Sequence, residues 1–545
     1  MQNTPPSGTP PDAPGGNTTS SNVTHLGATT LAETTVTDGQ TYSSITGGEN
    51  ALLVTGGDIT INGVTVTKSG DESSENSDFY GTNAAVLATG GSIILNGGSI
   101  TTDGAHANAL FAYGEGSVNA KNLTIKTSGN NSGGVMVTGG GTLLATDVTV
   151  STSGNSSAAI RSDRGGGTMT IDGGSYSTSG VGSPAIYSTA NITASNAELI
   201  STASEGIVVE GFNSVALYES TLTDTNNTLN GNSETYKNIF IYQSMSGDAE
   251  EGTGSFYSKG STITTNQGDT FFVTNTKASI NLESNRIVNN DMNGAFLRAQ
   301  AGKWGSAGSN GGQVELVLAN QVVEGDLVLD NLSTLYFTLS NTSYYMGIIN
   351  GANSAQNVSV TLDDTSQIVL AGDSYVSALT NTDTTNQNIY SNGYKLYVAG
   401  EEVAINGSAA PTAPEVTTDS EPEQTDGAAT DKSSSATTCK ETFFTDCSGN
   451  VKLPILVGGI AILVIILAIV AFVLHGKKKK GPKAPKNPDA PMGGPSMVPP
   501  APEGERPDFS AFDDGPVAQP QTPQTPTPPQ EQNSVGQNLE GFPKQ

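Results

Sequence analysis

The sequence has few of the residues on which most enzymes depend. Among 545 residues there are only 3 histidines, 2 cysteines and 1 tryptophan. His25 lies in an N-terminal segment that we expect to be flexible, His106 lies in a loop, and His475 follows a long apolar run. These residues form no Ser/His/Asp or Cys/His arrangement and no set with the spacing of metal ligands. The sequence therefore predicts a protein without metal or cofactor that is not an enzyme.

Basic residues are also scarce. The chain has 23 Lys and Arg against 52 Asp and Glu, and the whole excess of negative charge lies before residue 453. A surface of this sign repels the phosphates of nucleic acids and the headgroups of anionic lipids. We expect no nucleic-acid partner.

One segment, 453–474, is uncharged and almost wholly apolar. As a helix it would extend about 33 Å, enough to cross a hydrocarbon core of about 30 Å. A basic anchor, Lys477, Lys478, Lys479 and Lys480, follows it, and only Lys452 lies just before it. The positive-inside rule then predicts a single-pass protein of the cell surface, with its N-terminal part outside and its C-terminal tail in the cytoplasm.

The segments around this predicted transmembrane helix have little to bury. Residues 406–452 are rich in Ser, Thr and Pro and predict a disordered stalk, in which Cys439 and Cys447 are expected to form a disulfide or remain free thiols. The Pro-rich tail, 475–545, suits SH3 or WW modules, although an extended solvated chain is the commoner case. Residues 1–22 contain no apolar signal-peptide core, so we expect the true start to lie upstream.

Residues 45–230 contain an internal repeat of about 25 residues. Gly-Gly segments recur after Val54-Thr, Ala88-Thr and Val137-Thr. Short apolar runs recur with them, at Ala85-Val-Leu-Ala, Ala109-Leu-Phe-Ala, Gly134-Val-Met-Val, Ala158-Ala-Ile, Ala185-Ile-Tyr and Gly206-Ile-Val-Val. Between the runs, apolar and polar residues alternate and Gly, Asn, Asp and Ser supply the turns, which is typical of strands.

Two or three short strands per repeat describe one coil of a parallel β-helix. We therefore predict an all-β, right-handed parallel β-helix solenoid together with one transmembrane helix and disordered termini; an array of β-sandwiches is the alternative. The predicted parts are a disordered segment over 1–40, repeats over 41–310, and terminal coils with a cap over 311–405.

Later segments strengthen this prediction. Thr334-Leu-Tyr-Phe-Thr-Leu-Ser-Asn, Gly372-Asp-Ser-Tyr-Val-Ser-Ala-Leu and Ile389-Tyr-Ser-Asn-Gly-Tyr-Lys-Leu-Tyr-Val follow the repeats. With the repeats, they resemble adhesin-like microbial surface proteins built on a pectin-lyase-like right-handed β-helix, such as autotransporter passengers and polymorphic outer-membrane proteins. The resemblance implies a surface-exposed binding rod. It does not extend to the export route, because a predicted membrane helix stands where autotransporters have a β-barrel.

One group of residues could support catalysis on a polysaccharide. Arg161, Asp163 and Arg164 occur together, and Asp172 is expected one turn further on. Carboxylates with an adjacent arginine are the groups that hydrolysis or β-elimination of a polysaccharide requires. A solvated turn with a local ion pair is the commoner arrangement for such residues. A membrane-tethered lyase or hydrolase is therefore the alternative function.

Binding is the function that the sequence favours, with glycans or cell-surface proteins as partners. A long rod offers many weak polar and stacking contacts. The candidate aromatic residues, each expected more often between coils than exposed, are Phe111, Tyr113, Tyr176, Tyr187, Phe212, Tyr218, Tyr242 and Trp304. Candidate N-glycosylation sites are Asn122, Asn155, Asn191, Asn331, Asn341 and Asn357. A structural surface coat is the third possibility.

Overall fold

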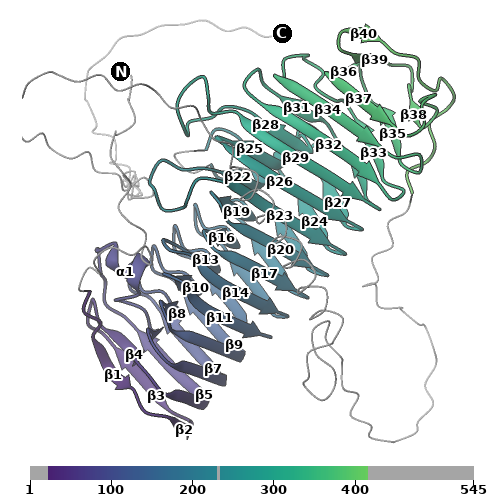
Figure 1. Ribbon diagram of the computed structural model, residues 1–545. Coiled ribbons are helices and arrows are strands. Elements are labelled where there is room, and N and C mark those ends of the chain that lie inside the picture. The colour runs from purple at the N-terminus through teal and green to yellow at the C-terminus, as the bar shows by residue number, and fades with distance from the viewer. Residues whose placement is uncertain (1–22, 230–232, 415–545) are drawn as a thin grey trace, which may run out of the picture. The chain divides into compact units, whose positions relative to one another are not determined.

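The computed structural model describes residues 23–229 and 233–414, which form a parallel β-solenoid of about 15 turns (Figure 1). All coils except the last few contribute one strand each to a 12-stranded sheet, here called the first sheet. Its strands are β1 (Gly27–Leu31), β4 (Asn50–Val54), β6 (Val86–Ala88), β8 (Leu110–Tyr113), β10 (Val135–Thr138), β13 (Ile160–Ser162), β16 (Ile186–Ser188), β19 (Ile207–Glu210), β22 (Lys237–Tyr242), β25 (Asp269–Thr274), β28 (Leu297–Ala299) and β31 (Leu327–Leu329). The predicted all-β parallel solenoid is thus confirmed.

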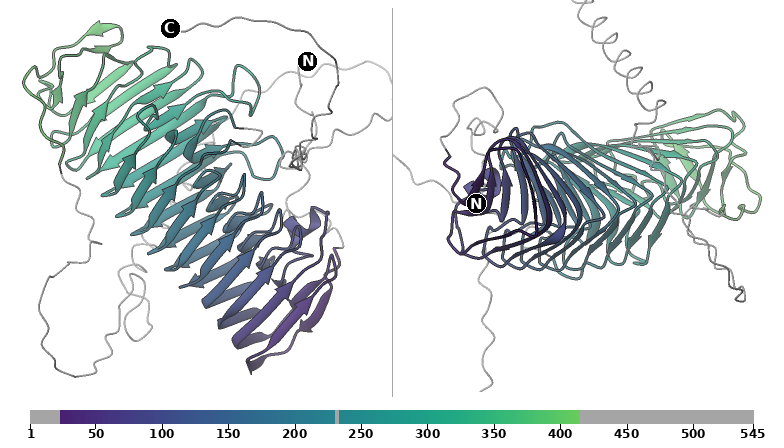
Figure 2. Two further views of the ribbon diagram at one scale, coloured as in Figure 1. Left: turned by 180° about the vertical axis from the view of Figure 1, so that it is seen from behind. Right: turned by 90° about the horizontal axis from the view of Figure 1, so that it is seen from below.

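In addition to its strand in the first sheet, each of the earlier coils has two further strand segments. In three coils these segments form single bent strands, β5 (Asp58–Lys68), β7 (Ser92–Thr102) and β9 (Ser117–Thr127). In the other coils they are separate strands: β2 (Thr35–Asp38), β3 (Thr41–Ser44), β11 (Gly141–Thr146), β12 (Thr149–Thr152), β14 (Gly167–Asp172), β15 (Ser175–Thr178), β17 (Asn191–Ser195), β18 (Glu198–Ser201), β20 (Ser214–Tyr218), β21 (Thr221–Asp224), β23 (Thr253–Lys259), β24 (Thr262–Thr265), β26 (Thr276–Glu283) and β27 (Arg286–Asn289). All of these pair in parallel with strands of neighbouring coils (Figure 2).

The last coils change their arrangement. The strands β29 (Gly312–Ala319), β32 (Thr334–Ser340), β34 (Asn357–Leu362) and β37 (Ala378–Asn381) continue the stack, while β30 (Val322–Glu324), β33 (Tyr344–Gly347), β35 (Gln367–Leu370) and β38 (Ile389–Tyr390) form a separate sheet. A third sheet contains β36 (Ser374–Val376), β39 (Leu396–Val398) and β40 (Glu401–Glu402). Because β40 pairs antiparallel with β39, it closes the stack at its C-terminal end.

A single corner of the coil explains much of the repeat. At this corner the chain takes positive φ angles between 47° and 72° in one coil after another. The stacked residues are Gly39, Gly63, Gly97, Asn122, Asp147, Gly173, Asn196, Glu219, Gly260, Ser284, Asn320 and Asn341. Glycine, asparagine and aspartate dominate because they adopt this conformation most readily. The periodic Gly and Asn of the sequence therefore mark where each coil bends.

A glycine at this corner and one just after it should respond differently to substitution by asparagine. Gly63 has a φ of +67°, and a Cβ there would have no atom within 4 Å. Gly98 has a φ of +113°, and its Cβ would lie 2.0 Å from the carbonyl oxygen of Val64. We expect Gly63→Asn to change the free energy of unfolding by less than about 1 kcal/mol, and Gly98→Asn to lower it by more than about 2 kcal/mol. Urea unfolding of both variants tests this, and equal losses would contradict the corner assignment.

A column of buried polar side chains runs through the interior of the solenoid. It lies at the end of the strand that follows the corner in each coil. Its members, aligned by strand register, are Ser44, Lys68, Thr102, Thr127, Thr152, Thr178, Ser201, Asp224 and Thr265. Two of the threonines hydrogen-bond to turn carbonyls: Thr127 Oγ1 donates to the oxygen of Ser132 at 2.6 Å, and Thr152 Oγ1 to that of Ser157 at 2.5 Å. These bonds satisfy backbone groups that would otherwise be buried without a partner.

The boundary predicted between the N-terminal segment and the repeats is wrong. Residues 1–40 were expected to be disordered, but β1 and β2 lie within them and His25 hydrogen-bonds to the carbonyl oxygen of Tyr80 at 2.9 Å. The first coil was missed because it has threonines where the next coil has aliphatic core residues. Thr29 aligns with Leu52, and Thr35 with Ile59. The first coil of the stack has a neighbouring coil on one side and water on the other, so apolar side chains there add less to stability than in an inner coil.

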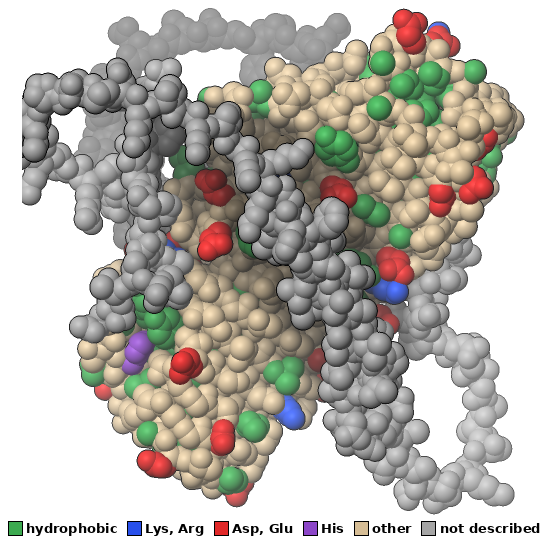
Figure 3. All heavy atoms as spheres, viewed as in Figure 1, with side chains coloured by type: hydrophobic (Ala, Val, Ile, Leu, Met, Phe, Trp, Pro, Cys, Tyr) green, Lys and Arg blue, Asp and Glu red, His purple; other side chains and the backbone are tan. Residues whose placement is uncertain are grey.

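The visible face of the described residues is polar. Figure 3 shows mostly backbone and uncharged side chains, with scattered acidic groups and few basic ones. This agrees with the excess of Asp and Glu in the sequence. Such a face offers hydrogen bonds rather than one strong charge to a partner.

Candidate functional site

The outer side of the first sheet carries one column of side chains that differs from the rest of the surface. Strand register aligns Met136, Arg161, Tyr187, Val208, Phe240, Phe272 and Arg298 along it. Side chains on the outer side of a solenoid sheet are usually exposed to solvent, yet Phe240 is only 8% exposed and Phe272 only 6%. Segments from neighbouring coils therefore cover this side of the sheet.

Four aromatic rings lie together on this side of the first sheet. Phe240 stacks on Tyr242 with ring centroids 4.4 Å apart and planes 12° apart, and Phe272 meets Phe240 edge-on at 5.8 Å. Trp304, from the segment after β28, contacts Tyr242 at a centroid distance of 5.1 Å. The rings bring together residues from three coils and form an apolar wall.

A buried ion pair lies beside the rings. Lys237 Nζ is 3.0 Å from Glu205 Oε1, and the two side chains are only 4% and 7% exposed. The lysine also donates to Ser233 Oγ and the carbonyl oxygen of Thr235, and lies 4.6 Å from the centroid of Phe240. Burial alone would raise the pKa of Glu205, but the adjacent Lys237 charge and the hydrogen bonds hold that pKa below its ordinary value.

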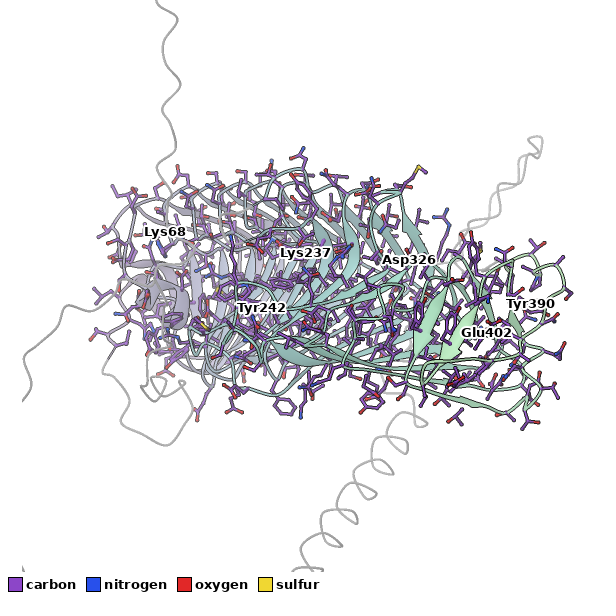
Figure 4. All side chains as sticks on the ribbon, turned by 90° about the horizontal axis from the view of Figure 1, so that it is seen from above. Lys68, Lys237, Tyr242, Asp326, Tyr390 and Glu402 are labelled. Atoms are coloured by element: carbon purple, nitrogen blue, oxygen red, sulfur yellow. The ribbon has the colours of Figure 1, made fainter. Side chains whose placement is uncertain are left out.

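These groups line a pocket that is open to solvent, and the roughly 660 Å³ of empty space within and above it includes open solvent. Three chain segments surround it: Gly182 to Pro184, Ser233 to Thr235, and Gln300 to Trp304. Figure 4 shows Lys237 and Tyr242, the two ends of β22, in the middle part of the solenoid. The pocket thus combines aromatic surface with a few fixed polar groups, as ligand sites usually do.

A second set of polar groups adjoins the pocket. Glu210 Oε2 accepts hydrogen bonds from the hydroxyl groups of Tyr187 and, at 3.1 Å, Tyr242. Burial raises the pKa of Glu210 above its ordinary value, and the two hydroxyl groups only partly oppose this. Burial also raises the pKa of Tyr187 well above its ordinary value, so this hydroxyl remains a hydrogen-bond donor.

The predicted Arg161, Asp163 and Arg164 group continues the same face, one coil nearer the N-terminus. Arg161 bridges Asp78 and Asp163, each at 3.2 Å, and Arg164 pairs with Asp248. Burial raises the pKa of Asp163 to about 7, against the opposing charge of Arg161. The fourth predicted member, Asp172, lies at the end of β14 in another sheet, where it accepts a hydrogen bond from Asn196 at 2.9 Å. The expectation that Asp172 joins this group is wrong, because the turn from Asp163 to Gly166 takes the chain out of the first sheet before β14 begins.

The candidate aromatic residues divide into several environments. Tyr187, Tyr242 and Trp304 line the pocket, as the binding hypothesis requires. The other five do not line it: Phe111 and Tyr113 pack near the N-terminal end of the first sheet, Tyr176 is in the core, Tyr218 packs on Tyr257, and Phe212 is exposed.

Sequence reasoning missed Glu205, Lys237, Phe240 and Phe272 as site residues. All four lie within the predicted repeats over 41–310, and the Phe-Ile-Tyr run of β22 has the alternation that points two rings to one side. The signal could not show which side faces outward. Only the register with Val208 in the preceding coil places Phe240 on the outer column.

The candidate glycosylation sites remain predictions. Asn122, Asn191, Asn331 and Asn341 are exposed, whereas Asn155 and Asn357 are half-buried.

Other predicted features lie outside the described residues: Cys439, Cys447, the 453–474 helix and the lysines Lys477 to Lys480. Across 23–229 and 233–414, no helix is long and apolar enough to span a membrane. Within the same residues, no group of three or more His, Cys, Asp or Glu side chains could hold a metal ion.

Comparison with known proteins adds no family to these observations. No protein-family model, curated protein or solved structure matches the chain.

Proposed function

We propose that this protein is an adhesin-like carbohydrate-binding protein of the cell surface, which holds glycans in the pocket on the outer side of the first sheet. The observation that carries this proposal is the pocket itself, where the rings of Phe240, Phe272 and Trp304 meet the buried Lys237–Glu205 pair. Sugar rings present apolar C–H faces that pack on aromatic rings, while their hydroxyl groups bind charged and amide side chains.

The parallel solenoid is compatible with this role. A rigid stack of coils carries the site on regular strands rather than on loops alone, and several copies on one surface would add weak affinities together. The pectin-lyase-like, right-handed type of β-helix belongs to this proposal. So does attachment to the bilayer through 453–474, with the described coils outside and the Pro-rich tail available to SH3 or WW modules.

A second candidate function is hydrolysis of a bound polysaccharide. It is supported by Asp163, which retains a proton near neutral pH and lies with Arg161 on the same face as the pocket. Hydrolysis needs a protonated carboxyl group and a second carboxylate, a role that Asp248 could take. Release of reducing sugar by the wild type but not by Asp163→Asn would favour the enzyme, and binding without release favours the adhesin.

We expect Trp304→Ala to weaken glycan binding at least tenfold, because it removes a ring at the mouth of the pocket. Isothermal titration with a glycan selected on an array measures this loss. The control is Tyr336→Ala, which removes an aromatic side chain that is 56% exposed on β32, in a different sheet. Equal affinity in wild type and the Trp304 variant would refute the proposed site.

A further inference from the structure

The outer side of the first sheet is closed at the N-terminal end of the pocket. The short helix α1 (Asn76–Tyr80) and Gly81 lie over the earlier coils, and a Cβ on Gly81 would be 2.7 Å from Leu87 Cδ1. The column residues beneath, Leu53, Leu87, Phe111 and Met136, form a separate buried cluster. α1 is fixed there by Thr138, whose hydroxyl donates to the carbonyl oxygen of Phe79 at 2.6 Å. In Figure 1, α1 projects from the same side of the solenoid as loops from the middle of the chain.

Arg164 joins this helix to a second covering segment. Its guanidinium carbon lies 3.8 Å from the centroid of the Phe79 ring, and its Nε pairs with Asp248 in the segment after β22. Asp78 of α1 pairs with Arg161. Two segments far apart in sequence therefore meet over the coil of β13 and form a wall across the outer face.

The opposite end is also bridged. Lys303 Nζ lies 3.8 Å from Glu234 Oε1, so the segment after β28 reaches the segment before β22. Between the wall and this bridge, the pocket floor runs from Tyr187 to Phe272, or three coil steps. At about 4.8 Å per step, the floor is about 14 Å long. An extended polymer could not run along the solenoid without meeting a wall.

The cations around the pocket are already compensated. Lys237 pairs with Glu205, Lys303 with Glu234, and Arg298 with Asp269 through two contacts of 2.7 and 3.1 Å. A carboxylated sugar would bring a charge for which no cation of the pocket lining remains unmatched, and it would also meet Glu205 and Glu234. The lining therefore favours an uncharged ligand.

We infer that the pocket receives the end of a neutral glycan chain, one to three sugar residues long, rather than an internal stretch of polysaccharide. This inference rests on the proposed function. It adds the class of ligand: neutral, terminal and short.

A chain-length series on the full chain tests the inference. The probes are gluco-, manno-, galacto- and N-acetylglucosamine-oligosaccharides from mono- to hexasaccharide, their uronic-acid counterparts, and cyclic glucans, which have no chain end. Trp304, the only tryptophan in the sequence, reports binding by its fluorescence. For at least one neutral series, we expect affinity to rise up to the trisaccharide and then stay constant. Uronic acids and cyclic glucans should bind at least tenfold more weakly.

The outcomes separate the two proposals. Affinity that keeps rising to the hexasaccharide, or equal affinity for cyclic and linear glucans, overturns the chain-end inference and leaves glycan binding in place. Absence of a response to every probe overturns both. Arg164→Gln should weaken the wall and move the plateau to longer chains, whereas Lys259→Gln, which alters an exposed pair on β23, should not. An unchanged plateau in a folded Arg164 variant would contradict the wall.

Discussion

Replacing Lys237 with methionine is expected to lower the free energy of unfolding by about 3–5 kcal/mol, the usual cost of leaving one partner of a buried ion pair alone. Glu205 would remain at 7% exposure without its cation. The pH dependence should also reverse. In the wild type the lowered pKa of Glu205 contributes stability above its unfolded pKa, and this is lost as the pH falls. Without Lys237, burial raises that pKa, so stability should fall as the pH rises.

Two variants complete this experiment. Adding Glu205→Gln to the Lys237 variant removes the uncompensated charge and should recover most of the loss. Lys303→Met breaks a pair whose side chains are 45% and 64% exposed and should cost less than about 1 kcal/mol. Urea unfolding at several pH values measures all three. If the Lys237 and Lys303 variants lose the same amount, the buried pair is not the anchor of the site.

Replacing Asp224 with threonine should stabilise the protein, with the largest effect near pH 8. Asp224 occupies the buried polar column between Ser201 and Thr265, and burial raises its pKa from 3.8 to about 8. Between these pH values the folded state retains a proton that the unfolded state loses. Stability therefore decreases as the pH rises, by about 1.4 kcal/mol per pH unit and by up to about 6 kcal/mol in all. Threonine does not titrate, so it removes this dependence of stability on pH, and it is also the residue at this position in several other coils.

Urea midpoints of the wild type and the Asp224 variant, measured from pH 4 to pH 9, test this expectation. The two curves should meet near pH 4 and diverge up to pH 8. Asp364→Thr, which removes an exposed carboxylate, should give a curve parallel to that of the wild type. Parallel curves for the Asp224 variant as well would show that its carboxyl group titrates normally.

The sequence predicted the solenoid because the signals of a coil are local. Inward-facing aliphatic residues repeat along the first sheet, and corner residues such as Gly63, Asn122 and Asn196 recur in phase. The first coil was not predicted because Thr29 and Thr35 occupy positions that are aliphatic in the next coil. A pattern of apolar residues identifies a coil only where that coil is covered by another coil on both sides, and the first coil is covered on one side only.

The site was less predictable because it depends on contacts between distant segments. Sequence alone placed Arg161 beside Asp163, which are two residues apart, but it could not place Asp78 or Asp248 against them. It also named Tyr242 and Trp304 without bringing them together. These contacts depend on the register between coils and on the loops that lie over the sheet. Neither can be predicted from the spacing of residues in the sequence.

The central claim is that glycans bind in the pocket beside Trp304. Tryptophan fluorescence of the full chain during titration with an array-selected glycan tests it most directly, because excitation at the long-wavelength edge of the absorption band reports this single residue. We predict a saturable shift in emission whose midpoint equals the affinity measured by calorimetry. Calorimetric binding with no change in the Trp304 emission would contradict the account, because the glycan would then occupy another part of the protein.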